Sequence, residues 1–188
     1  LNKLNAEGMQ RFLEQMPRMP NLRSLNLAEN QFAVAGFSGA AFSRLAECAP
    51  ALEELNLNSS CLGSDHSVLR AVVQGLPSTL TVLHLGVSQL VAPGGYPAGR
   101  KSSGADLTGF LLLIDALPVL ARLRRLSLVH ARLDDTAADT LVERVPLVKL
   151  PALQQLDVSG NPMSSSAAKR LAVALKRSSN IKLMGARP

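Results

Sequence analysis

The chain has 188 residues, of which 47% are hydrophobic but only 3% aromatic, and its formal net charge is +6. This length provides one core of ordinary size, in which leucine, alanine and valine must do the packing. No apolar run is long enough to span a bilayer, and the first four residues do not resemble a signal peptide. The only cysteines, Cys48 and Cys61, lack a cysteine-rich pattern, which favours an intracellular, cytoplasmic location with both thiols buried.

The spacing L-x-x-L-x-L-x-x-N-x-L recurs five times along the chain, with variants. The first leucines of the copies lie 30, 28, 43 and 30 residues apart, at Leu22, Leu52, Leu80, Leu123 and Leu153. This spacing is the signature of a leucine-rich repeat, a strand and helix that must stack on neighbours to bury an apolar face. We therefore predict an α/β leucine-rich-repeat solenoid with short parallel strands on its concave face and helices on its convex face.

The ends of the chain carry incomplete copies of the pattern. Leu1 to Leu4 matches the end of the motif and precedes an expected helix near residues 6–16, while Ile181-x-Leu183 predicts a sixth strand. We predict one domain over residues 1–188, with about five full repeats and a partial repeat at each end. Because terminal repeats usually need polar caps and none is evident at the start, we expect a fragment or a subunit whose ends a partner covers.

The segments between the strands carry helical patterns. Caps are expected at Asp135 and at Ser164 to Ser166, before the last two helices. The segment 107–117 is apolar nearly all round, with Leu112 opposite the core stripe and Leu113 on its flank. The core stripe itself is assigned to Leu107, Phe110, Leu111, Ile114 and Leu117.

The 43-residue period contains about 14 extra residues, which we place in a flexible insertion loop at 91–105 because this segment is rich in proline, glycine and serine. The loop carries Tyr96, Arg100 and Lys101 as expected partner contacts. The alternative is a tolerated surface insertion, since loops accept length at low cost.

Between the inward leucines, the remaining strand positions should point outward on the concave face. They place acid at Glu53-Glu54, a mildly apolar centre at Thr81-Val82 and base at Arg124-Arg125. An apolar centre with charged flanks is typical of a protein-binding surface, although single exposed apolar residues also occur on solvated faces. The residues predicted to bind protein are Arg23, Glu53, Glu54, Thr81, Val82, His84, Arg124, Arg125, Gln155 and Asp157.

Three of the outward strand residues are of the types found in a hydrolytic triad, but they follow one another across the strands in the wrong order. His84, Ser127 and Asp157 occupy equivalent positions on consecutive strands. A triad needs histidine between the nucleophile and the carboxylate, whereas here serine lies in the middle. Phosphate-binding loops, metal-ligand spacings and cofactor motifs are also absent from the sequence. We therefore predict no enzymatic activity, no cofactor and no metal site.

Charge is distributed unevenly between the two halves of the chain. Residues 1–94 carry 6 basic and 7 acidic side chains, a net of −1, and residues 95–188 carry 14 and 7, a net of +7. On the last expected helix, Lys169, Arg170, Lys176 and Arg177 lie opposite the core stripe and offer docking to an acidic partner. Nucleic acid is the less favoured partner, because aromatic residues for base stacking are missing there. The alternative is a solvated helix face.

The whole chain resembles the ribonuclease-inhibitor-like leucine-rich repeats, an intracellular subclass with repeats of 28 to 30 residues. This subclass includes ribonuclease inhibitor, the sensor domains of NOD-like receptors, Ran GTPase-activating proteins, and actin regulators of the tropomodulin and CARMIL type. The resemblance implies that Asn2, Asn30 and Asn161 bond to adjoining loop backbone, whereas Ser60, Ser88 and Ala131 depart from this asparagine position and predict a less regular central stack. It also implies a non-enzymatic scaffold for protein–protein interaction, although fold alone does not define function. The alternative function is that of a structural subunit that docks through its basic C-terminal half in a large assembly, for example a ribonucleoprotein.

Overall fold

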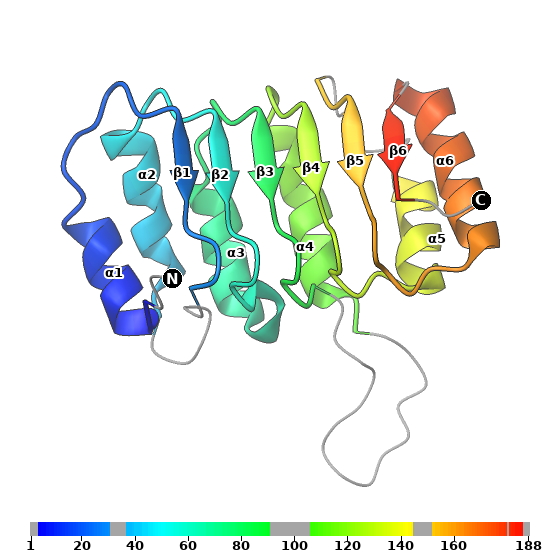
Figure 1. Cartoon of the computed structure of the whole chain (residues 1–188), viewed down its shortest axis with the longest axis horizontal. Coiled ribbons are helices and arrows are strands. Elements are labelled where there is room, and N and C mark those ends of the chain that lie inside the picture. Colours follow the sequence, from blue (N-terminus) through cyan, green and yellow to red (C-terminus); the bar gives the residue numbers. More distant parts are fainter. Residues whose placement is uncertain (1–3, 31–36, 91–105, 145–151, 180, 186–188) are drawn as a thin grey trace, which may run out of the picture.

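The computed structural model describes residues 4–30, 37–90, 106–144, 152–179 and 181–185, and within them one parallel sheet runs the length of the molecule (Figure 1). Its six strands follow one another in chain order. Each strand spans three residues: β1 Ser24–Asn26, β2 Glu54–Asn56, β3 Val82–His84, β4 Arg125–Ser127, β5 Gln155–Asp157 and β6 Lys182–Met184. The fold is the predicted leucine-rich-repeat solenoid, and the expected sixth strand is present.

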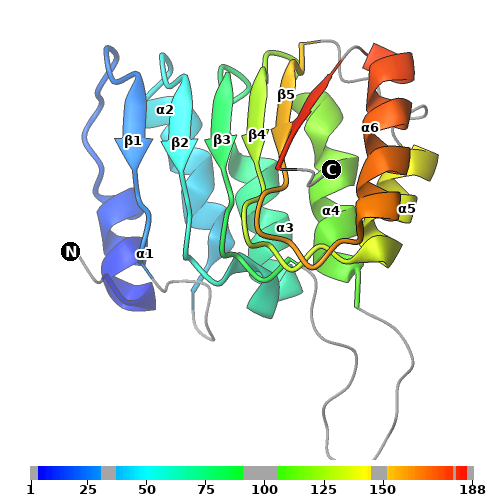
Figure 2. The same ribbon diagram turned by 45° about the vertical axis from the view of Figure 1, so that its right-hand side comes forward.

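Helices connect the strands and lie together behind the sheet, as the turned view also shows (Figure 2). The α-helices are α1 Ala6–Glu14, α2 Ser43–Cys48, α3 His66–Gly75, α4 Thr108–Ala116, α5 Asp135–Arg144 and α6 Ser165–Ser179, with 3-10 turns η1 Gly39–Phe42, η2 Leu62–Ser64 and η3 Leu117–Val119. None of the described helices combines the length and apolar character needed to cross a bilayer. We call the side of the sheet that faces away from the helices the strand face; it is the predicted concave face.

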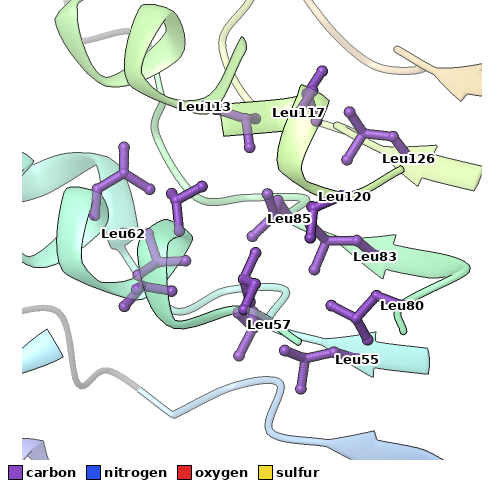
Figure 3. Close-up of a cluster of buried hydrophobic side chains, with 14 of the residues drawn as sticks. Leu55, Leu57, Leu62, Leu80, Leu83, Leu85, Leu113, Leu117, Leu120 and Leu126 are labelled. Carbon is purple, nitrogen blue, oxygen red and sulfur yellow. The ribbon is translucent and has the colours of Figure 1, made fainter. Parts of the chain in front are cut away.

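Alternation along each strand directs the middle leucine into the space between sheet and helices. These leucines pair in one continuous row from Leu25 to Leu183. Leu55 and Leu83 are wholly buried, and Figure 3 shows them in one cluster of buried side chains with Leu113 of α4 and Leu117 of η3. The strand face is therefore free of structural leucines, and its side chains are available for other roles.

Asn30 and Asn161 form the hydrogen bonds to neighbouring backbone that the resemblance implied. Asn30 accepts a hydrogen bond from the Leu4 amide at 2.8 Å, and Asn161 accepts one from the Leu133 amide at 2.9 Å. Asn161 also donates to the Leu128 and Val158 carbonyls, each at 2.8 Å. Both side chains thus join one repeat to the next, while Asn2 lies outside the described residues.

The expectation of a less regular central stack is wrong for the sheet. The Ser60 hydroxyl donates to the Leu57 carbonyl at 2.6 Å, and the Ser88 hydroxyl donates to the Gly86 carbonyl at 3.2 Å, both within their own turns. The strands on either side keep the same register as the others. Leucine packing and backbone pairing therefore maintain the stack without asparagine at these positions.

Three local predictions need correction. Cys48 is buried as expected, but Cys61 is only half-buried, because it lies in a turn with a left-handed φ of 58°. In α4 the buried face includes Leu113, whereas Leu111 is half-buried like Leu112. In α4 the error is a rotation of the buried face by part of a helical turn, which the apolar pattern of a nearly all-hydrophobic helix does not resolve.

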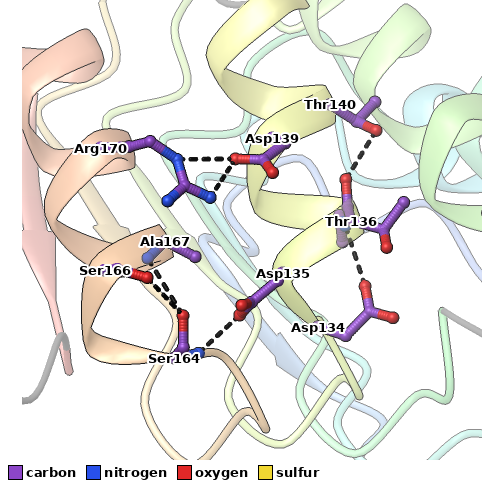
Figure 4. Close-up of polar contacts among 10 residues, drawn as sticks. Asp134, Asp135, Thr136, Asp139, Thr140, Ser164, Ser166, Ala167 and Arg170 are labelled. Atoms are coloured by element: carbon purple, nitrogen blue, oxygen red, sulfur yellow. Dashed lines mark hydrogen bonds and ion pairs between the residues drawn. The ribbon is translucent and has the colours of Figure 1, made fainter.

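The caps of the last two helices also differ from the prediction (Figure 4). Asp134, not Asp135, caps α5 by accepting the Ala137 amide at 2.9 Å. Asp135 instead accepts the Ser164 amide of the next repeat at 2.6 Å, and this bond lowers the pKa of its carboxyl below the ordinary value. Ser164 caps α6 as predicted, with its hydroxyl accepting the Ala167 amide at 3.2 Å.

Replacing Asp65 with asparagine should make stability less dependent on acid pH. Asp65 caps α3, and hydrogen bonds from the Ser67 hydroxyl and the Val68 amide lower the pKa of its carboxyl below its ordinary value. A lowered folded-state pKa contributes stability that is full above the unfolded pKa and is lost as pH falls through the folded pKa.

Asparagine remains a good cap but does not titrate. Urea denaturation at pH 7 and about pH 3 should therefore show a smaller difference in unfolding free energy for Asp65→Asn than for the parent chain. An equal difference in the two proteins would contradict the assignment.

Candidate protein-binding face

The strand face presents its side chains in two rows that cross all the strands. The first row runs through Ser24, Glu54, Val82, Arg125, Gln155 and Lys182, and the second runs through Asn26, Asn56, His84, Ser127, Asp157 and Met184. Arg23, Glu53, Thr81 and Arg124 precede the strands by one residue. The structure therefore brings six of the ten residues predicted to bind protein into the two rows of one face and places the other four at the start of its strands.

The acidic side of this face is paired within the chain. Arg23 forms an ion pair with Glu53 of the next repeat. Glu54 lies 3.4 Å from the His84 imidazole and accepts a hydrogen bond of 3.4 Å from the Ser24 hydroxyl. These carboxylates already have cationic or polar neighbours, so they are less available to a partner than the sequence suggested.

Polar residues of the second row terminate the strands. Asn26, Asn56 and Asp157 each accept the backbone amide two residues ahead, at 2.9 to 3.0 Å, which bends the chain out of the sheet. The Asp157 carboxylate also accepts the Ser159 hydroxyl at 2.6 Å. Asp157 is therefore a turn residue in this structure, a role that its outward position alone did not indicate.

The centre of the face is apolar, as predicted. Val82 is half-buried. The Thr81 hydroxyl donates to the Glu53 carbonyl at 3.2 Å, so the Thr81 methyl group is the part of this side chain that remains for the surface. Just past β3, Val87 is 46% exposed with a left-handed φ of 55°, a conformation that β-branched residues rarely adopt. The Val87 amide donates to the Val129 carbonyl at 2.8 Å, so two valines lie side by side at this edge.

The basic side of the face has no such pairing. Arg124 and Arg125 are exposed, and within the described part of the chain neither guanidinium has an ion pair or hydrogen bond. Gln155 on the adjacent strand also has no side-chain hydrogen bond among these residues. Beside it lies Lys182 of β6, exposed and likewise unpaired.

Lys182 is a member of this cluster that the sequence analysis missed. The register Gln155↔Lys182 places it in the same row as Arg125, with one strand between them. The predicted strand Ile181-x-Leu183 contained the signal, because its middle residue must point outward.

The row that resembled a triad does not assemble one. His84, Ser127 and Asp157 pair in the predicted order, with serine in the middle. His84 lies next to Glu54 on the other side, and Asp157 is bonded to Ser159. Among the described residues, no group of three or more histidine, cysteine or acidic side chains lies close enough to hold a metal ion.

The other predicted contacts are placed differently. Lys169, Arg170, Lys176 and Arg177 are exposed on α6, but Arg170 binds Asp139 of α5 through two nitrogens at 3.0 and 2.6 Å (Figure 4). Lys176 and Arg177 lie in the last turn of α6, where cations stabilise the helix dipole. Part of this set thus has a structural role, and Tyr96, Arg100 and Lys101 lie outside the described residues.

Two hollows of similar size lie away from the centre of the strand face. One, of about 410 Å³, lies between the turn at His130 and Gly160 and the start of α6. The other, of about 400 Å³, lies between α3 and α4 and is lined by Leu112 and the 65% exposed Val119. Both are shallow openings without a converging set of buried polar groups.

Comparison with solved structures agrees with this architecture. The leucine-rich repeat-containing protein LegL7 from Legionella pneumophila aligns over 93% of this chain with a TM-score of 0.59 and 20% identity, and the chain spans only 50% of that protein. The tropomodulin C-terminal domain from Caenorhabditis elegans aligns over 92% of each chain, with a TM-score of 0.52 and 16% identity. No protein-family model matches the sequence, and neither does any curated protein. At these identities the likeness establishes the leucine-rich-repeat fold.

Proposed function

We propose that this protein is a non-enzymatic interaction scaffold that binds another protein through its strand face. One observation carries the proposal: none of the described helices lies over the strand face (Figure 1), and this face combines half-buried Val82 with charged flanks. An apolar centre surrounded by polar groups is the usual anatomy of a protein interface. On sequence grounds, the segment 91–105 is proposed as a second contact.

The alternative, docking of an assembly subunit through α6, has less support. Arg170 holds α5 against α6, and Lys176 and Arg177 lie at the helix end, where their charges already stabilise the helix. The strand face offers a larger set of side chains with no structural task.

The proposal predicts that Val82→Glu will abolish binding of selected peptides. A random dodecapeptide library displayed on phage would be selected against the full chain, and the enriched peptides would be measured by fluorescence polarisation. Because the substitution places a charge in the apolar centre, we expect a loss of at least about tenfold in affinity.

Val119→Glu is the matched control, since Val119 lies in η3, on the helix side of the molecule, and is already exposed. It should leave the affinity unchanged, and circular dichroism would verify that both variants fold. Failure to enrich any peptide, or enriched peptides that tolerate Val82→Glu, would overturn the proposed function.

A further inference from the structure

The charged groups of the strand face fall into two sets: the carboxylates of the N-terminal strands have side-chain partners within the chain, and the cations of the C-terminal strands have none among the described residues. On β1 to β3, the carboxylates of Glu53 and Glu54 already face Arg23, His84 and Ser24. On β4 to β6, the cations of Arg124, Arg125 and Lys182 face no carboxylate within ion-pair distance among the described residues. The sequence showed acid on one side and base on the other, but only the structure shows that the base alone is available.

The carboxylate nearest to these cations along the strands is already engaged. Asp157 lies on β5, between Ser127 and Met184, and its oxygen accepts both the amide and the hydroxyl of Ser159. No salt bridge joins Asp157 to Arg125 or Lys182. Adjacent cations repel each other, and an external anion would relieve this repulsion while forming charge-assisted hydrogen bonds.

We propose that Arg124, Arg125 and Lys182 bind an acidic, extended segment of a partner protein. This inference rests on the proposed function and specifies the chemistry of the partner. The arginine fork matches a carboxylate with two parallel hydrogen bonds. Gln155, between Arg125 and Lys182, supplies an amide that both donates and accepts, as a peptide group requires.

The spacing of the cations indicates how the acidic residues are arranged. Arg125 and Lys182 are separated by two strand intervals, about 10 Å in total. In a polyproline II segment, side chains three residues apart lie on one side and about 9 Å from each other. Acidic residues at every third position therefore fit the row, and prolines that continue the segment beyond Arg125 can contact Val82 and Thr81.

A protein segment fits this surface better than a nucleic acid. The two rows contain no phenylalanine, tyrosine or tryptophan on which a base could stack. The first row also combines the cations with apolar Val82. A surface that only tracks phosphates would need a longer basic groove, whereas here the unpaired cations are confined to the last strands of the sheet.

The test uses the full chain and a fluorescein-labelled peptide of four Glu-Pro-Pro triplets, with four Gln-Pro-Pro triplets as the uncharged control. We expect the glutamate peptide to bind with an affinity that falls as salt rises, and the glutamine peptide to bind at least about tenfold more weakly. The double variant Arg124→Gln/Arg125→Gln should lose at least about tenfold in affinity.

Two further variants distinguish recognition by the arginine side chains from non-specific electrostatic attraction. Arg124→Lys/Arg125→Lys keeps the charge but removes the forks, so its affinity should be intermediate. Lys176→Gln/Arg177→Gln removes the same charge from α6 and should bind like the parent chain. If this α6 variant weakens binding as much as the glutamine variant of β4, the effect is non-specific attraction and the proposal is wrong.

Other outcomes would also overturn the inference. Equal binding of both peptides, no binding of either, or a single-stranded dodecanucleotide binding at least about tenfold tighter than the glutamate peptide would each do so. Failure of this inference can be distinguished from failure of the proposed function. If library peptides depend on Val82 but are not acidic, the strand face remains a binding site and only its assignment to an acidic partner fails.

Discussion

Replacing Phe110 with alanine should lower the free energy of unfolding by about 3–5 kcal/mol. Phe110 lies in α4, is wholly inaccessible to solvent, and belongs to the continuous core between the sheet and the helices. Its ring is one of the few aromatic groups in a core built mostly of leucine, so its loss leaves a cavity that small side chains cannot fill. Urea denaturation followed by far-ultraviolet circular dichroism measures the effect.

Phe12→Ala provides the matched control for this prediction. Phe12 lies in α1 and is 36% exposed, so its truncation should cost below about 1 kcal/mol. Because a repeat protein is stabilised by contacts between neighbouring repeats, the Phe110 variant should also weaken the packing of α3 on α4. Equal losses in the two variants would show that the core is not organised as the structure indicates.

The fold could be predicted from the sequence because its determinants are local. Strand alternation and the repeat interval alone place Leu55, Leu83 and Leu126 in one row, and the structure pairs them in that register. The same reasoning identified β6 from two residues, Ile181 and Leu183. Where two adjacent residues compete for one role, as Asp134 and Asp135 do, the pattern was insufficient, because the cap depends on one backbone dihedral.

The positions of the candidate site residues could be predicted from the sequence, but not which of their charges already have a partner within the chain. Alternation places Glu54 and Arg125 on the same face, and the structure confirms this placement. Which charges are neutralised depends on side-chain contacts between repeats about 30 residues apart, such as Arg23 with Glu53. No sequence pattern specifies such rotamers. The structure therefore reduces ten outward residues to a smaller set without intramolecular partners, and that set determines where binding should be tested.

Asn30→Ala should cost about 2–4 kcal/mol, because it leaves several buried backbone groups without partners. Asn30 is only 4% exposed. Its amide donates to the Leu27 and Ala28 carbonyls at 2.9 and 3.2 Å, while its oxygen accepts the Leu4 amide at 2.8 Å. The last bond connects the segment before α1 to the first repeat, so hydrogen exchange in α1 should accelerate as well.

Asn30→Ser distinguishes the two roles of this side chain. In the neighbouring repeat, the Ser60 hydroxyl bonds to the Leu57 carbonyl of its own turn at 2.6 Å. Serine at position 30 should likewise retain the bond within the turn but lose the one to Leu4, so it should cost less than alanine while exchange in α1 still accelerates. Asn21→Ala is the exposed control and should change neither quantity. If exchange in α1 stays slow in both Asn30 variants, leucine packing rather than Asn30 holds α1 against the first repeat.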